Sequence, residues 1–164
     1  MRAGTLLVII VVIAAAVGVG IMVQKKNAAA TPPTPAGPPA DAQFIPAEMQ
    51  PGDVVGSIMR KNAGTSQYIG MWIPEPGWDM GVDDMEKASD GGWALKQYRA
   101  EHAGALGGGY WLLAGVPFET EVKKGDHVFI SGKIEKVESY NDGGITPAYR
   151  IVVRPAKAIS NTKR

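Results

Sequence analysis

The chain contains no cysteine, which excludes disulfides, thiolate metal sites, cysteine nucleophiles and a lipid-modified cysteine. Histidine is almost as scarce: the 164 residues contain only His102 and His127. A zinc site would have to recruit carboxylates from distant parts of the chain. The sequence therefore predicts neither a metal site nor a cofactor.

Catalytic motifs are also lacking, since no serine lies in a G-x-S-x-G elbow or pairs by spacing with a histidine. The stretch KGDHVFISGKI at 124–134 has the glycines and lysine of a phosphate loop but a different spacing. Six residues separate Gly125 from Gly132 where a Walker loop has four, and Ile134 replaces the hydroxyl. Because the intervening residues are β-branched or aromatic, they favour an extended strand. We predict no catalytic residue and no enzymatic activity.

Net charge is small, at +1, but it is unevenly distributed along the chain. Residues 1–40 carry a charge of +3, residues 41–121 a charge of −7, and residues 122–164 a charge of +5. A fold that brings the last two parts together would cancel most of this imbalance. The alternative is a basic face on the final strands, formed by the outward side chains of Lys133, Arg150 and Arg154.

A long uncharged run follows a short tail at residues 1–3. Residues 4–23 have no charged side chain, and twenty apolar residues are enough for one helix to span a bilayer. We predict an uncleaved transmembrane signal-anchor. The alternative is a cleaved secretory signal, because Ala28 and Ala30 fit a small-x-small cleavage rule.

The flanking charges bear on orientation. Arg2 precedes the run while Lys25 and Lys26 follow it, so the positive-inside count is nearly balanced. The very short leading tail favours a carboxyl-terminal domain outside the cytoplasm. We therefore expect a single-pass protein of the bacterial inner membrane with a periplasmic domain.

Two features of the amino-terminal part concern contacts and reach. Small residues four apart in the apolar run allow close helix approach and homo-oligomerisation, in the pairs Ala14 with Gly18 and Ala16 with Gly20. Residues 24–43 form a Pro/Ala-rich linker, with five prolines between 28 and 43. Such a linker is either a semi-rigid extended stalk or a disordered tether.

A folded domain is expected at residues 44–160, followed by a tail at 161–164. Residues 127–137 and 149–159 alternate apolar and polar side chains with the two-residue period of a half-buried strand. An Asn-Asp-Gly-Gly turn joins them as a hairpin. Pro155 requires an edge or a bulge in the second strand.

Upstream patterns are weaker. Residues 54–59 and 67–73 fit a second hairpin, and 109–118 fits a third short strand. Residues 93–104 keep the spacing of a helix of about ten residues. The predicted fold class is thus mainly β with one short helix, in a small closed barrel of five strands.

Residues 122–134, VKKGDHVFISGKI, resemble the "v-k-x-G-D-x-V-x-v-x-G-x-v" strand of many OB-fold domains, and 149–159 resembles a later strand of that barrel. The resemblance implies an OB-like five-stranded β-barrel behind the transmembrane helix and linker. It implies no single function, because OB barrels bind nucleic acids, sugars, peptides and proteins.

One aromatic residue is singled out as a binding candidate. Trp78 follows Pro-Glu-Pro-Gly, which predicts a loop with an exposed indole able to anchor a partner. Together with the basic candidates Lys133, Arg150 and Arg154, it forms the predicted binding set. We expect a membrane-anchored, non-enzymatic binding or scaffold module of a cell-envelope assembly, with a protein partner.

Two alternatives belong to other classes. The first is a periplasmic small-ligand carrier or chaperone, since the haem chaperone of cytochrome c maturation shares the layout of anchor plus barrel. Its family pattern has a tyrosine four residues after the haem-binding histidine, where this chain has Ser131 after His127 and Leu106 after His102. The second is a membrane-tethered single-stranded nucleic-acid binder, against which the net charge near zero argues.

Overall fold

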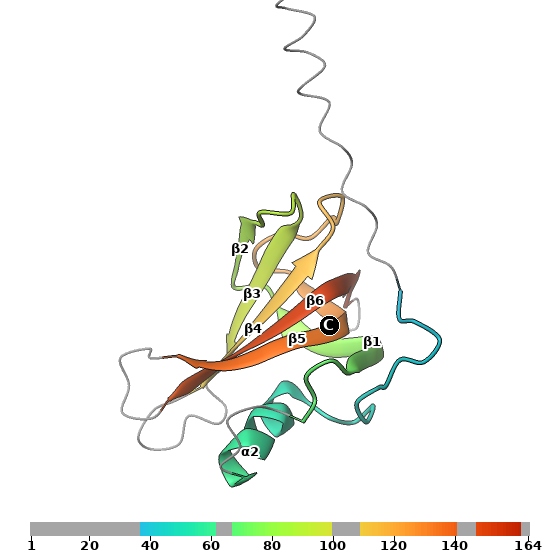
Figure 1. Cartoon of the computed structure of the whole chain (residues 1–164). Helices are drawn as coiled ribbons and strands as arrows, with labels where there is room; N and C mark the ends of the chain where they lie inside the picture. Colours follow the sequence, from blue (N-terminus) through green and yellow to red (C-terminus); the bar gives the residue numbers. More distant parts are fainter. Residues whose placement is uncertain (1–36, 62–66, 100–108, 141–146, 162–164) are drawn as a thin grey trace, which may run out of the picture. The chain divides into compact units, whose positions relative to one another are not determined.

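The computed structural model describes residues 37–61, 67–99, 109–140 and 147–161. These residues form one helix and six strands, shown in Figure 1. The helix is α2 (Pro51–Lys61), and the strands are β1 (Trp72–Gly81), β2 (Asp84–Lys87), β3 (Trp93–Arg99), β4 (Tyr110–Val116), β5 (His127–Tyr140) and β6 (Ala148–Ser160).

All six strands belong to one sheet, in the order β1-β5-β6-β4-β3-β2. Neighbours are antiparallel except β4 and β6, which run parallel. The order ends at β1 and β2, which are not paired with each other, so the sheet is open. This corrects the prediction of an OB-like closed barrel of five strands. Only Val82 and Asp83 separate β1 from β2, so one continuous stretch of chain supplies both edge strands.

The long β5–β6 hairpin confirms the two clearest strand predictions. Register shifts between Gly132 and Lys136 mark irregular pairing, which includes the bulge expected near Pro155. Side chains of alternate residues enter the core, including Val128 and Ile130 from β5. The two-residue period of apolar residues in the sequence therefore correctly indicates strands with one face turned toward the core.

Residues 54–59 are helical, which corrects the prediction of a strand there. Pro51 begins α2, where a missing backbone N–H costs nothing, and Asp53 accepts a hydrogen bond from the Gln50 backbone at 2.9 Å. Val54 and Ile58 are buried with helical spacing, and α2 packs against β4. The cap and the four-residue spacing together outweigh the β propensity of the valines.

Residues 93–99 form β3, which corrects the start of the predicted helix at 93–104. A turn from Ala88 to Gly92 joins β2 and β3, with Gly91 at a φ of +86°. β3 then pairs with β2 on one side and β4 on the other. Pairing on both sides satisfies its backbone groups better than one short helix would, because a helix leaves its ends unpaired. The remainder of the predicted helix lies outside the described residues.

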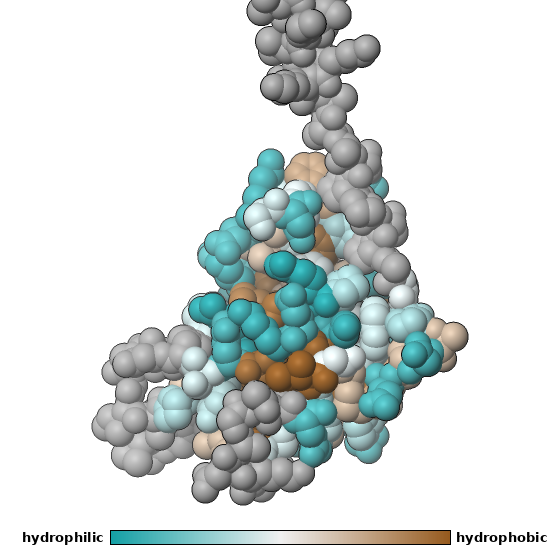
Figure 2. Space-filling view, viewed as in Figure 1, coloured by the Kyte–Doolittle hydropathy of each residue, from teal (hydrophilic) through white to brown (hydrophobic). Residues whose placement is uncertain are grey.

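The strand predicted at 67–73 begins only at Trp72 and continues to Gly81. Within the described ranges, no helix has the length and apolar character needed to cross a bilayer. The predicted tail at 1–3, the transmembrane segment at 4–23 with its small-residue pairs, and the linker up to residue 36 lie outside those ranges. Figure 2 shows hydrophilic side chains over much of the viewed face, with smaller apolar areas between them.

Candidate functional site

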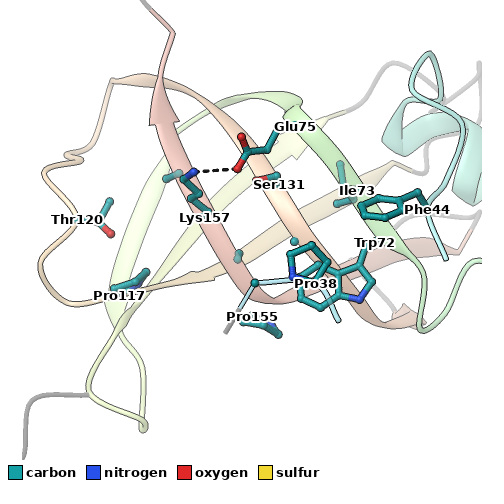
Figure 3. A pocket seen from close by; sticks show the side chains of 14 residues that line it. Pro38, Phe44, Trp72, Ile73, Glu75, Pro117, Thr120, Ser131, Pro155 and Lys157 are labelled. Atoms are coloured by element: carbon teal, nitrogen blue, oxygen red, sulfur yellow. Dashed lines mark hydrogen bonds and ion pairs between the residues drawn. The ribbon is translucent and has the colours of Figure 1, made fainter. Parts of the chain in front are cut away.

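A pocket of about 590 Å³ opens beside β1, β5 and β6. Its size falls within the roughly 300–1,000 Å³ typical of ligand pockets in proteins. Figure 3 shows the side chains that line it. They come from five parts of the chain: Gly37, Pro38 and Phe44 before α2; Trp72, Ile73 and Glu75 of β1; Pro117 and Thr120 after β4; Ser131 and Gly132 of β5; and Pro155, Ala156, Lys157 and Ala158 of β6.

Small residues on neighbouring strands create the hollow. Gly132 of β5 is directly opposite Ala156 of β6, and Ala158 follows two residues later in the lining, so side chains are small along this part of the hairpin. Gly132 has a φ of +150°, and a Cβ there would collide with the Pro155 carbonyl oxygen. Only glycine fits where the two strands approach this closely. The cavity thus depends on the strand register as well as on residue type.

Rings form much of the pocket wall. Trp72 is 9% exposed and lies at the start of β1, while Phe44 is 45% exposed at the same end of the pocket. Proline rings at 117 and 155 complete this lining. A large aromatic side chain left half in water beside an apolar hollow is a feature of surfaces that contact a ligand or partner.

Two polar groups in the wall lack a partner. Ser131 is 6% exposed, and its hydroxyl makes no hydrogen bond to any residue in the described part of the chain. The Trp72 indole N–H has no acceptor among those residues either, whereas the Trp78 and Trp93 indoles each donate to a carbonyl. A buried polar group without a partner costs roughly 1–3 kcal/mol. Two such groups in one pocket indicate hydrogen-bonding positions for a ligand.

The charges at the pocket are paired. Lys157 donates to Glu75 at 2.8 Å, drawn as the dashed line in Figure 3. Both side chains are about three-fifths exposed, so the pair contributes little stability. Because they are the only ionisable side chains among the described residues of the lining and neutralise each other, the pocket suits an uncharged ligand.

Trp78 does not lie where its flanking residues predicted. It is part of β1, opposite Ile130 of β5, and only 2% exposed. Its Nε1 donates to the Met49 carbonyl at 2.7 Å. The turn-forming residues before it form a bulge between Ile73 and Trp78 rather than a projecting loop. The prediction of an exposed indole anchor is therefore wrong, and Trp78 is a core residue.

The basic candidates lie on β5 and β6, and none of them lines the pocket. Lys133 is half-buried and opposite Trp72 in the β1–β5 register. Arg150 forms an ion pair with Glu138 at 3.4 Å. Arg154 is exposed, and its guanidinium lies over Gly115 of β4. The structure thus places these side chains along the outside of the hairpin, with an acidic residue among them.

A second aromatic pair lies on the neighbouring strands. Tyr98 of β3 is opposite Trp111 of β4, and their rings are 5.2 Å apart and tilted by 47°. Trp111 is in register with Arg150 of β6. The two rings pack against each other, and Arg150 is engaged by Glu138. This arrangement offers fewer free groups to a ligand than the pocket does.

Ionisable side chains meet at one further place. His127 Nδ1 is 3.4 Å from Asp79 Oδ1, and the Asn161 amide donates to the same oxygen at 3.3 Å. No group of three or more potential metal ligands occurs among the residues the structure describes. His102 lies outside them. The Asp79 cluster joins β1 to the start of β5 and the end of β6, which is a structural role.

Sequence reasoning missed Trp72, Phe44 and Ser131, which are the residues that give the pocket its chemistry. One signal was available: Ser131 precedes a mid-strand glycine, a pattern that marks close backbone approach. Comparisons of the chain with protein-family models, curated proteins and solved structures found no match.

Proposed function

We propose that this chain is a non-enzymatic binding module that holds a protein partner at a bacterial envelope membrane. The partner inserts a segment into the pocket formed by β1, β5 and β6. The observation that carries the proposal is the pair of donors, Ser131 and Trp72, without a partner among the described residues, in a hollow whose lining is mainly apolar. Such donors can hydrogen-bond to a ligand that displaces water from the pocket.

Phe44 favours a partner protein over a small molecule carried in the pocket. It is 45% exposed at the pocket, so the apolar contact surface continues from the interior onto the outside of the domain. A small ligand held in the hollow would leave such a side chain in water. A chain segment that enters the pocket and then crosses the surface would cover it.

The membrane part of the proposal rests on the sequence of residues 4–23 and 28–43. An uncharged run of that length supports a tether, and the proline-rich stretch that follows supports an extended connection to the domain. Tethering raises the effective concentration of the domain for partners at the same membrane. A modest pocket affinity is then sufficient for occupancy.

Photo-crosslinking tests the pocket as the binding site. The photoreactive residue benzoylphenylalanine replaces Thr120, which lines the pocket. After irradiation of membranes from cells that express this variant, it should be crosslinked to a partner protein. The same group at Ser89, which is exposed on the β2–β3 turn, is the matched control. The Thr120 crosslink should disappear when Trp72 is also changed to alanine. Equal crosslinking from both positions, or persistence in the Trp72 variant, would contradict the proposal.

The absence of cysteine makes the topology directly measurable. Ser89→Cys introduces the only thiol of the chain, at an exposed position. A membrane-impermeant maleimide should label it in intact spheroplasts if the domain faces the periplasm. Labelling that requires lysis would place the domain in the cytoplasm instead.

A further inference from the structure

We infer that the segment entering the pocket is proline-rich and binds as a polyproline II helix. This inference rests on the proposed function and specifies the partner's chemistry. The main alternative for an extended segment is addition as an extra strand, in which backbone hydrogen bonds to a sheet edge supply the affinity. The edge strand next to the pocket is β1.

The structure closes the part of that edge beside the pocket, from Trp72 to Pro76, to strand addition. At its start, the Trp72 N–H donates to the Gln43 carbonyl at 2.7 Å, and the Trp72 carbonyl accepts from Ile45 at 2.9 Å. Further along, Pro74 and Pro76 have no backbone N–H and lie in the bulge of β1. An incoming strand would find the first ladder positions occupied and the next ones without donors. Side chains of the pocket must therefore provide the recognition.

The pocket wall resembles the surface that polyproline helices prefer, which is a groove lined with aromatic rings. Trp72 and Phe44 supply flat faces, and the neutral mouth imposes no charge requirement. The chain already places one proline in this wall, because Pro38 lines the pocket together with Trp72, as Figure 3 shows. A proline ring is thus compatible with the shape of this surface.

Hydrogen-bond complementarity points the same way. A polyproline II helix has no internal hydrogen bonds, and prolines offer carbonyl acceptors without N–H donors. The pocket presents the opposite pattern, since the Trp72 indole N–H and the Ser131 hydroxyl are both donors without acceptors in the described chain. One three-residue turn of such a helix rises about 9 Å. A cavity of about 590 Å³ can accommodate part of a segment of this kind.

Calorimetry with full-length chain in a nonionic detergent tests the inference. The probe is a decaproline peptide, and a Gly-Ser decapeptide of equal length is the control peptide. Decaproline should bind and the control should not. Trp72→Phe removes the indole donor and should weaken decaproline binding about tenfold, whereas Trp111→Phe, outside the pocket, should change it less than about twofold.

Ser131→Ala provides a readout that a structural role would not give. The hydroxyl has no partner in the described chain, so its removal should leave the melting temperature unchanged or higher while lowering decaproline affinity about fivefold. A lower melting temperature with unchanged affinity would overturn the assignment. So would decaproline binding that is insensitive to both Trp72→Phe and Ser131→Ala.

Three further outcomes would separate the inference from the proposed function. In the first outcome, a decapeptide of alternating leucine and serine binds and depends on Trp72, whereas decaproline does not bind. This result would keep the pocket as a segment-binding site but overturn the requirement for proline. A self-associated chain that decaproline dissociates would assign the pocket to the linker of a second copy and overturn the assignment to another protein. Decaproline binding without a Thr120 crosslink in membranes would support the ligand chemistry and contradict the envelope partner.

Discussion

The substitution Trp78→Phe tests whether this indole supports the core or contacts a partner. Trp78 is 2% exposed, and its Nε1 holds the Met49 carbonyl at 2.7 Å, just before α2 begins. Phenylalanine removes the donor and part of the ring. Loss of the hydrogen bond to a partly buried carbonyl costs roughly 1–2 kcal/mol, and the smaller ring leaves a cavity worth a similar amount.

The expected destabilisation is therefore about 2–4 kcal/mol, which lowers the melting temperature by roughly 10–20 °C for a domain of this size. Thermal unfolding followed by near-ultraviolet circular dichroism of the full chain in detergent measures it. Trp111→Phe is the matched control, because Trp111 is only half-buried and its indole has no hydrogen bond to a described residue. That control should cost less than about 1 kcal/mol.

Loss of the hydrogen bond between Trp78 and Met49 should also have a local effect on α2. Because Met49 connects directly to the first turn of α2, loss of its indole partner should loosen the attachment of the helix to β1. Amide hydrogen exchange in α2 should increase more than exchange in β6. An exposed indole would give a different result, with a melting temperature shifted by only a few degrees and unchanged exchange. That outcome would refute the assignment of Trp78 to the core.

Substitutions at three further positions test the pocket and the helix start by thermal unfolding. Gly132→Ala should cost roughly 3 kcal/mol or more, because its Cβ would meet the Pro155 carbonyl; a melting temperature near that of the parent would contradict the close approach of β5 and β6. Asp53→Ala should cost about 0.5–1 kcal/mol through loss of the Gln50 backbone contact, while Asp53→Glu should recover most of it, because a glutamate at the third helical position can reach back to the same backbone N–H; no recovery with glutamate would contradict the capping role. Lys157→Gln should lower the melting temperature by no more than a few degrees, since the ion pair it breaks is exposed; a larger fall would show that the pair holds the pocket in shape.

Local patterns predicted the strands that are longest and most regular. Apolar core residues recur two positions apart in both strands, such as Val128 with Ile130 and Ile151 with Val153, although residues 130–132 and 151–153 are each buried in succession. A dense turn sequence separates the strands, so periodicity and turn chemistry agree. The strand prediction for residues 54–59 was wrong because a short segment with four apolar side chains among six residues fits a strand or one face of a helix equally well. Pro51 and Asp53 are typical of a helix start, but this local signal alone did not decide between helix and strand. The packing of α2 on β4, which the sequence does not show, favours the helix.

β3 shows a different limit. Leu95 and Gln97 are its buried residues, which is strand spacing, yet the same stretch also has helical spacing, from Trp93 to Gln97 and from Leu95 to Tyr98. The two patterns cannot be separated within one short segment. Pairing with β2 and β4 selects the strand. These two strands come before and after the segment in the sequence, so the segment alone cannot predict them.

The pocket could not be predicted because its chemistry depends on register. Trp72 and Ser131 are separated by about half of the sequence of the domain, and both reach one cavity only because β1 pairs with β5 near Gly132. A register shifted by one residue would move Ser131 to the core face and close the hollow with Gly132 turned away. Sequence alone gave no means of choosing that register.

Ion pairs connect the acidic middle part of the chain to its basic final part at two places. Glu75 and Asp84 from the middle part lie near Lys157 and Lys124 from the final part, at 2.8 and 4.0 Å. These pairs are of the kind expected if the fold cancels opposite charges, although other ion pairs, such as Arg150 with Glu138, lie within one part. The ion pair of Glu75 and Lys157 also leaves the pocket without net charge from these two lining residues. Recognition there depends on ring contacts and the two buried donors, and salt should affect it little.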